Sequence, residues 1–222
     1  MARLRLEFFH DVVCCWCYNM SSRLRQLDTE FDLDIRHRTF VLQASEDEIT
    51  SRWGSPDEAR TKILTHWAAC REVSDTPEGL NIDAMAAAEF DYPHGWEAAL
   101  ACKGAERIGG QAAHWDMFDA IQRAHLTQAR NVADVDVLMD VGRESGLDFS
   151  ALRQMIRDPM TAELVEADRH AARQFQVSTI PAVILRETGQ RLVNGPIDDL
   201  RAQLRSATRL ALECEEHHDA LC

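Results

Sequence analysis

Long apolar runs are missing from this sequence, and so is a secretory leader. No stretch reaches the roughly eighteen apolar residues that a membrane-spanning helix needs, so we expect no association with a membrane. The first residues, "MARLRLEFFHD", hold neither an apolar segment of sufficient length nor a cleavage site. We therefore expect a cytoplasmic protein.

Lysine is also scarce. Lys62 and Lys103 are the only lysines among 24 basic residues, and 37 acidic residues bring the net charge to −13. A strongly acidic chain is repelled by the phosphate backbone, which argues against a general nucleic-acid-binding protein. The phosphate-binding P-loop, the glycine-rich dinucleotide turn and the H-E-x-x-H zinc motif are absent as well.

Cysteine, by contrast, occurs seven times, and an odd number without a leader does not suit a secreted disulfide framework. Three of the seven cysteines fall within four positions of "DVVCCWCYN", residues 11–19. Closely spaced cysteines in a reducing compartment indicate redox chemistry or metal binding. The remaining sequence has to decide which of Cys14, Cys15 and Cys17 act together.

Sheet-forming segments lie near both ends of the chain. Residues 3–10 read as a strand, residues 18–31 show helical spacing of apolar residues, and residues 33–41 alternate as a second strand. Near the C-terminus, "AVILRETGQRLVN" predicts a hairpin, and residues 197–213 predict an amphipathic helix. The order is therefore β-α-β at the start and β-β-α at the end.

The middle of the chain is predicted to hold five or six helices. Asn131, Asp148 and Asp158 are suitable N-cap residues for three of them, and Gly109 with Gly110 ends another or allows close packing. We expect one small α/β domain built from both flanking pieces, with the helical block inserted into it. The predicted limits are 1–44 and 176–213 for the α/β domain, 45–175 for the helical domain and 214–222 for a flexible tail.

Helical geometry separates the three clustered cysteines. If a helix starts at the first of them, each residue turns about 100° around the axis, so Cys14 and Cys17 share a face and Cys15 points away. A disulfide between the neighbours Cys14 and Cys15 would be strained. Cys14 lies closest to the unpaired amides and positive dipole of the helix N-terminus, which favour a thiolate. The pattern predicts Cys14 as the nucleophile and Cys17 as the cysteine that resolves the mixed disulfide.

Two other roles remain open for these cysteines. Zinc usually takes four ligands and one C-x-x-C supplies two, so a zinc site would need a second cluster at the C-terminus, alone or joined to the first. That cluster consists of Cys214, His217, His218 and Cys222. Plain burial is the other role, and we expect it for Cys15 rather than for Cys14 and Cys17.

A proline precedes the apolar strand of "VSTIPAVIL", residues 177–185. Proline lacks a donor for a sheet, so at a strand entrance it indicates a turn. Taken alone, Pro181 favours an ordinary trans bond. Beside a C-x-x-C and in this order of elements, it predicts a cis bond that presents the preceding backbone to an incoming peptide and keeps metal away from the thiols.

The chain resembles the DsbA-like branch of the thioredoxin superfamily, most closely its cytoplasmic FrnE-like members. The resemblance rests on "FFHDVVCCWCYNM", "RHRTFVL", the helical middle and "VSTIPAVIL", and covers the chain to about residue 210. Relatives usually carry Asp followed by C-P-W-C-Y. The matching residues here are Asp11, Cys14, Trp16, Cys17 and Tyr18, and Cys15 stands where the relatives have proline.

This resemblance implies an α/β thioredoxin-like fold with a large all-helical insertion domain and an activity in thiol–disulfide exchange. Carried over, Cys14 attacks, Cys17 resolves, and Pro181 is the cis-proline facing them. Ile180 would pair its backbone with a substrate, with Trp16 and Thr179 beside it as further substrate-binding residues. The implied partners are protein or small-molecule thiols and disulfides. No bound cofactor or metal is implied, although glutathione or another small thiol is a candidate co-substrate, and the protein is expected to be a monomer or homodimer.

Other relatives on the same fold keep a second function open. Kappa-class glutathione transferases and 2-hydroxychromene-2-carboxylate isomerases activate glutathione with a serine near the first motif. Here Ser21 and Ser22 lie a turn or more further along, and cysteines occupy both motif positions, so a glutathione-dependent enzyme is the second hypothesis. A zinc-binding module built on the cysteines is the third.

Several remaining residues have two interpretations each. His10 and Asp11 flank the cysteines and either assist proton transfer or serve as strand and loop-capping residues. Cys70 and Cys102 are expected in the core, since free cysteine is among the most buried residues. The C-terminal pair Cys214 and Cys222 is either a secondary redox pair, as some FrnE-like proteins carry, or part of a solvated tail.

Overall fold

The computed structural model describes the backbone of residues 3–219 and the side chains of residues 3–210. Within that part of the chain, no helix combines the length and apolar character needed to cross a membrane.

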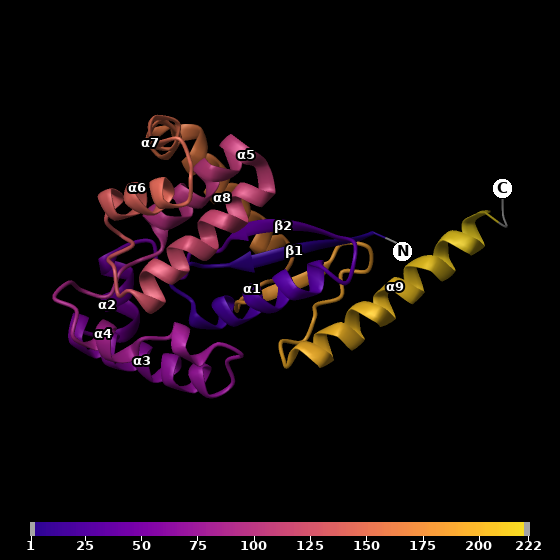
Figure 1. Cartoon of the computed structure of the whole chain (residues 1–222), viewed down its shortest axis with the longest axis horizontal. Coiled ribbons are helices and arrows are strands. Elements are labelled where there is room, and N and C mark those ends of the chain that lie inside the picture. The colour runs from indigo at the N-terminus through magenta and orange to yellow at the C-terminus, as the bar shows by residue number, and fades with distance from the viewer. Residues whose placement is uncertain (1–2, 220–222) are drawn as a thin grey trace.

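A small mixed sheet in the middle of the protein joins the N-terminal strands to the segment that follows the helical block (Figure 1). Its strand order is β2-β1-β3, and its strands are β1 (Leu4–His10), β2 (Leu33–Thr39) and β3 (Ala182–Leu185). The first two strands are parallel and joined by helix α1 (Cys15–Asp28), whereas β3 pairs antiparallel with β1. The β-α-β opening and the return of the C-terminal segment to the same sheet are confirmed.

Both faces of the sheet are covered, and six of the seven residues of β1 are buried, Arg5 being the exception. Leu6 and Phe8 pack into the main core together with Leu24 of α1. Phe9 points to the other face, where it lies in a second cluster with Ala172. β1 therefore buries residues of both its faces, although Arg5 and Glu7 alternate with apolar residues in its first half.

The predicted hairpin after β3 forms with only one regular strand. Leu192 donates its amide to the Val183 carbonyl at 2.8 Å, and Arg191 forms an isolated bridge with Ile184, so the chain does turn back. The return arm does not extend beyond this bridge as a strand. Val193 is 72% exposed, so this arm has little apolar surface to bury against the sheet.

The chain between β2 and β3 forms seven α-helices, more than the five or six predicted. Residues 46–72 form two helices rather than one, because Gly54 ends the first and Ser55 begins the next with a capping box. A short 3₁₀ turn and a π-helical turn interrupt the block. The seven helices are α2 (Glu46–Trp53), α3 (Pro56–Glu72), α4 (Ile82–Ala86), α5 (Trp96–Gln122), α6 (Val135–Glu144), α7 (Phe149–Arg157) and α8 (Pro159–Gln174).

Two of the three predicted N-caps in this block are confirmed. Asp148 and Asp158 accept backbone amides of α7 and α8 at 2.7 and 3.0 Å. The prediction for Asn131 is wrong, because its side chain closes a tight turn and Asp134 caps α6 instead. Gly110, with φ of 72°, kinks α5 rather than ending it, since the helix resumes after the glycine pair.

The closing helix α9 (Ile197–Asp219) is longer than the predicted 197–213. Leu200 and Leu204 are buried, in agreement with the predicted apolar side, and the helix then runs outward from the rest of the protein (Figure 1). Of the predicted tail, the side chain of Cys214 and the whole of Cys222 lie outside the described residues. The proposed domain limits stay a prediction.

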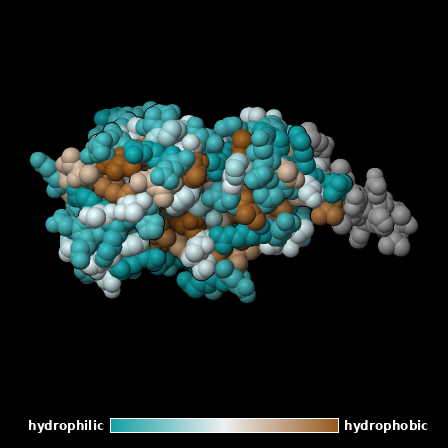
Figure 2. Space-filling model, turned by 90° about the horizontal axis from the view of Figure 1, so that it is seen from below, coloured by the Kyte–Doolittle hydropathy of each residue, from teal (hydrophilic) through white to brown (hydrophobic). Residues whose placement is uncertain are grey.

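One face of the protein shows no broad apolar surface. Figure 2 presents this face as mainly hydrophilic, with apolar patches separated by polar side chains. Val73, Phe149 and Val193 are among the more exposed large apolar residues, and they lie far apart in the sequence: just after α3, in α7, and in the loop before α9. Isolated exposed apolar residues of this kind are normal for a soluble surface.

A buried ionic network fastens the helical block to the sheet. Asp168 of α8 accepts Arg38 of β2 and Lys103 of α5, each at 2.7 Å, and also the backbone amide of Thr39 at 3.0 Å. Glu7 of β1 accepts the same arginine at 2.6 Å. Because the carboxylates and Lys103 are almost fully buried, each charge depends on its partners to offset the loss of water.

We expect Asp168→Asn to lower the free energy of unfolding by about 3–5 kcal/mol, since it leaves two buried cations without their shared carboxylate. Urea unfolding at neutral pH measures the change. Glu166→Gln on the same helix removes an exposed ion pair with Arg169 and should change stability by less than about 1 kcal/mol. Equal losses in the two variants would contradict the importance of the buried network.

Candidate active site

Cys14 occupies the junction between β1 and α1. It is the N-cap residue of the helix, with extended backbone angles (φ −91°, ψ 107°), and no side chain caps the first turn. Its carbonyl accepts the amides of Cys17 at 3.0 Å and Tyr18 at 3.3 Å, while Gln122 of α5 donates to the same carbonyl at 3.1 Å. The strand-to-helix turn predicted from the sequence is thus held in place from both sides.

The three clustered cysteines differ in exposure. Cys14 is 7% exposed, Cys15 4% and Cys17 0%, and all are free thiols here. Burial raises the pKa of the Cys17 thiol well above its usual value, and a hydrogen bond with the Cys14 thiol raises it further. Cys17 therefore stays protonated behind Cys14, which is the more accessible of the two.

Cys15 turns away from this pair toward α3. Its thiol donates to the His66 carbonyl at a sulfur–oxygen distance of 3.9 Å. A hydrogen bond with the Cys70 thiol, together with burial, raises the pKa of Cys15. Asn19 donates to the Cys70 sulfur at 3.2 Å, so both thiols lie in one contact between α1 and α3. The buried role expected for Cys15 and Cys70 agrees with this arrangement.

A groove of about 370 Å³ opens in front of Cys14. It lies between the β1–α1 turn, helices α2 and α3, and the segment that leads into β3. Of the residues named from the sequence, Trp16, Thr179 and Ile180 line it, and the peptide bond between Ile180 and Pro181 is cis. Pro181 itself is not part of the lining; the residue before it is. The lining comprises Val13, Cys14, Cys15, Trp16, Phe40, Leu42, Gln43, Arg52, Trp53, Ile63, His66, Trp67, Tyr92, Ser178, Thr179 and Ile180.

Several groove residues carry no signal in the sequence. Arg52 and His66 bring polar groups into the groove from α2 and α3, and Phe40 adds an apolar wall after β2. In the sequence, each of these residues fits the usual pattern of polar and apolar residues of its own segment. Only the packing of the helical block against the sheet brings them to the cysteines.

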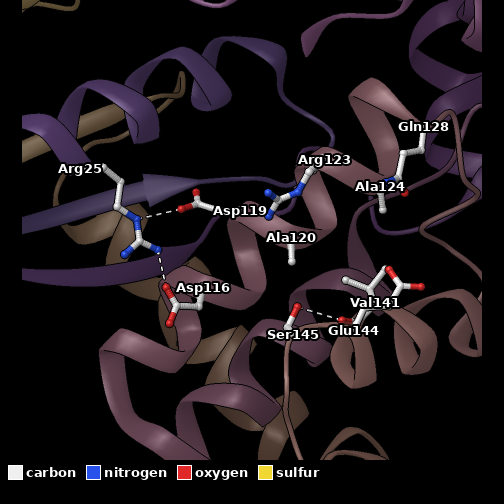
Figure 3. A pocket seen from close by; sticks show the side chains of 10 residues that line it. All are labelled: Arg25, Asp116, Asp119, Ala120, Arg123, Ala124, Gln128, Val141, Glu144 and Ser145. Atoms are coloured by element: carbon white, nitrogen blue, oxygen red, sulfur yellow. Dashed lines mark hydrogen bonds and ion pairs between the residues drawn. The ribbon is translucent and has the colours of Figure 1, made fainter.

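A larger cavity of about 550 Å³ lies elsewhere, between α1, α5 and α6, and shares no lining residue with the cysteine groove. Figure 3 shows Arg25 reaching from α1 toward two carboxylates of α5. It pairs with Asp116 at 2.7 Å and Asp119 at 2.8 Å. Because Arg25 is paired with these carboxylates and no cysteine lines the cavity, we place the candidate site at the cysteines.

Asp11 holds the loop between β1 and Cys14. Its carboxylate accepts the amides of Leu42 at 2.6 Å and Val13 at 3.3 Å. Gly95 packs so closely that a Cβ at that position would lie 2.5 Å from the carboxylate. Burial raises the pKa of Asp11, and its charge in turn contributes to the raised pKa of Cys17. These contacts support the loop-capping interpretation of Asp11, and its part in proton transfer stays a prediction.

His10 does not share this position. It is 1% exposed and lies among His37, His114 and Phe118, away from the groove lining. Burial lowers its pKa well below the usual range. Cys102 is also buried, as predicted, in the same part of the core.

A hydrogen-bonded aromatic cluster contacts the backbone of the turn that leads from β1 to Cys14. Tyr92 donates to the Val13 carbonyl at 3.2 Å and accepts the indole N–H of Trp67 at 3.2 Å. His125 meets the same hydroxyl at 3.0 Å and is fully buried. Burial lowers the pKa of His125 to about 3. The loop backbone therefore rests on a cluster that requires a neutral histidine.

Comparisons with known proteins agree with this geometry. A family model described as a DSBA-like thioredoxin domain matches residues 5–205. The chain is similar in fold to the cytosolic disulfide reductase DsbM from Pseudomonas aeruginosa (24% identity, TM-score 0.72, covering 93% of this chain and 100% of that one). The same reductase solved with GSH gives a TM-score of 0.74 at 23% identity, again covering 93% and 100%. A 2-hydroxychromene-2-carboxylate isomerase gives 0.63 at 16% identity, covering 96% and 98%. A search of proteins with curated function finds no match.

The neutral state of His125 makes the protein sensitive to acid. Below pH 6.5 the unfolded chain takes up a proton at this position, whereas the folded chain does so only near pH 3. The free energy of unfolding should therefore fall with decreasing pH by about 1.4 kcal/mol per pH unit from this group. His125→Gln should remove that part of the slope between pH 6 and 4.5, measured by urea unfolding, while the exposed His170→Gln keeps the wild-type slope. Parallel slopes in all three proteins would contradict the prediction.

Proposed function

Since this chain belongs to the family of DSBA-like thioredoxin domains, we propose that it is a thiol–disulfide oxidoreductase whose redox pair is Cys14 and Cys17. The observation that carries the proposal is that the two cysteines differ in their exposure to solvent. Cys14 lies at the helix N-terminus and lines an open groove, whereas Cys17 is fully buried and its thiol has a raised pKa, chiefly through burial and in part through the Cys14 thiol. The finer placement among FrnE-like members remains a prediction.

The proposed reaction begins with the Cys14 thiolate. The unpaired amides of the first turn of α1 stabilise negative charge at this position. The thiolate attacks one sulfur of a substrate disulfide, forming a mixed disulfide and releasing the other substrate sulfur as a thiolate that takes up a proton. Cys17 then loses its proton and attacks the Cys14 sulfur, which releases the second substrate thiol. The substrate gains two electrons, and the protein is left with a Cys14–Cys17 disulfide; the same steps run backward oxidise a dithiol.

Asp11 is our candidate acceptor for the Cys17 proton. It is a buried carboxylate with a raised pKa, and its charge acts on Cys17. A carboxyl group poised in this way exchanges protons nearer to neutral pH than an exposed one does. Its backbone contacts with Leu42 and Val13 fix its orientation.

The substrate-binding edge is proposed at Thr179 and Ile180, with Trp16 and Trp53 at the sides of the groove. A chain in extended conformation would pair with the Ile180 backbone as an added strand. The groove volume of about 370 Å³ also suits a small thiol, and the DsbM reductase was solved with GSH. We propose a glutathione-sized thiol as co-substrate and, by analogy with that cytosolic reductase, a cytosolic location.

The glutathione-dependent isomerase is the second candidate, supported by the fold similarity to 2-hydroxychromene-2-carboxylate isomerase. The serine such a mechanism needs is poorly placed here. Ser21 donates to Asp119 at 2.6 Å and accepts the Trp115 indole at 2.7 Å, and it does not line the groove. A zinc module built on the cysteines ranks last, because the pair Cys14 and Cys17 supplies only two ligands and the side chains of the C-terminal cluster lie outside the described residues.

Substitution of single cysteines tests the redox pair. Cys14→Ser should reduce insulin-disulfide reduction and dithiol oxidation to background, because the attacking thiolate is gone. The matched control Cys15→Ser removes a neighbouring buried thiol and should keep most of the activity. Equal loss in the two variants would overturn the pairing.

Trapping tests the small-thiol co-substrate. In a glutathione redox buffer, Cys17→Ser should accumulate a mixed disulfide between glutathione and Cys14, since no resolving thiol remains. Mass mapping of peptides identifies the modified cysteine, and wild-type protein should show the Cys14–Cys17 disulfide instead. Modification mainly at Cys15 would contradict the assignment. Strong transfer of glutathione to an electrophile by Cys14→Ser protein would favour the isomerase-like alternative.

A further inference from the structure

Three histidines from distant parts of the chain converge inside the core. His10 ends β1, His37 lies in β2, and His114 comes from the second part of α5. Each offers a ring nitrogen, and these nitrogens all lie within 4.8 Å of one another. The three side chains are 1%, 0% and 0% exposed. The cluster belongs neither to the cysteine groove nor to the large cavity at Arg25.

The imidazole nitrogens of this cluster have almost no hydrogen-bond partners. Both ring nitrogens of His10, both of His37 and Nε2 of His114 are buried without one. An unsatisfied buried polar atom typically costs about 1–3 kcal/mol, so five in one place is an unusual burden for a core. Lone pairs that converge in this way are what a cation requires.

The remaining nitrogen of His114 has a carboxylate partner. Nδ1 lies 2.8 Å from Oε2 of Glu106, which precedes the kink of α5 at Gly110. A carboxylate there holds the proton on Nδ1 and leaves the Nε2 lone pair free and oriented. This carboxylate–histidine arrangement commonly stands behind histidines that bind zinc.

The surroundings suit a cation as well. Phe8 and Trp115 pack against the His37 ring, and Phe118 packs against the His10 ring. Lys103 brings a positive charge nearby, and it is neutralised by Glu106 and Asp168, each at 2.7 Å. His10 also faces a cavity of about 10 Å³, close to the space that one water molecule occupies.

We propose that His10, His37 and His114 form a buried three-histidine site for a divalent cation of the zinc class, which joins the sheet to α5. Three imidazoles are a known ligand set for zinc, with zinc–nitrogen distances of about 2.0–2.1 Å and a fourth position for water. In tetrahedral geometry those distances place neighbouring nitrogens about 3.3 Å apart. Small side-chain rotations from the present arrangement would supply that approach. Because the rings are closed off from solvent, the site is structural, and it is independent of the proposed redox pair.

Metal loading during refolding tests the site directly. The full chain is unfolded with a chelator present, refolded with zinc sulfate, and freed of weakly bound metal by gel filtration. We expect one zinc ion per chain by mass spectrometry of metals, and a thermal transition that rises relative to chelator-refolded protein. Cobalt(II) in place of zinc should give the visible spectrum of a tetrahedral nitrogen site without a thiolate charge-transfer band.

Variants separate this site from the cysteines. His37→Gln should weaken zinc binding by more than about a hundredfold, and Glu106→Gln, which changes only the supporting carboxylate, by about 10- to 100-fold. His125→Gln, another buried histidine outside the cluster, should bind zinc as the wild type does. A triple variant with serine at Cys14, Cys15 and Cys17 should also keep its zinc. Circular dichroism confirms that each protein is folded, and Glu106→Gln provides the test if His37→Gln does not fold.

Three outcomes would overturn the proposal. The first is correctly refolded wild-type protein that retains no stoichiometric zinc or cobalt. The second is metal that survives in folded His37→Gln or Glu106→Gln at wild-type affinity. The third is metal that is lost from the triple cysteine variant or shows a thiolate band with cobalt, which would assign the site to the cysteines.

Discussion

The position of the helical block on the sheet depends on the buried interactions of Asp168. From α8, Asp168 binds Arg38 of β2, Lys103 of α5 and the backbone at the end of β2. Both faces of the three-stranded sheet carry apolar residues, so helices must cover both of them. Apolar packing drives that coverage but has little directional preference. A buried carboxylate shared between two cations tolerates few orientations, so it sets the position of the helical block on the sheet.

The candidate active site follows from that position. Once α5 lies along the sheet, Gln122 reaches the Cys14 carbonyl and His125 meets Tyr92 below the loop. The same docking brings α2 and α3 over the cysteines and closes one side of the groove. Cys14 thus faces a defined space, while Cys15 is drawn into the contact between α1 and α3. The third thiol, which replaces the proline of the relatives, is occupied by a structural contact.

Polar groups in this core fall into two classes with different consequences. The ionic network around Asp168 and the cluster around Tyr92 satisfy most of their donors and acceptors within the protein. The histidines at positions 10, 37 and 114 do not, although they are equally buried. A folded core seldom leaves so many imidazole nitrogens without partners, and that contrast points to a ligand rather than to packing.

Local features of the sequence were enough to predict the strand-to-helix turn at Cys14, the separation of Cys15 from the other two cysteines, the caps at Asp148 and Asp158, and the thioredoxin-like order of elements. Each of these depends on residues close together in the chain, where helical rotation, capping and β-propensity act directly. The prediction for Asn131 was wrong because asparagine is equally suited to cap a helix and to close a turn, and local sequence does not distinguish the two. The contact of Cys15 with Cys70, the groove walls at Arg52 and His66, and the meeting of His10 with His37 and His114 were decided only by the tertiary structure. These partners lie tens of residues apart, and their meeting depends on how the inserted helices dock on the sheet, which no local pattern records.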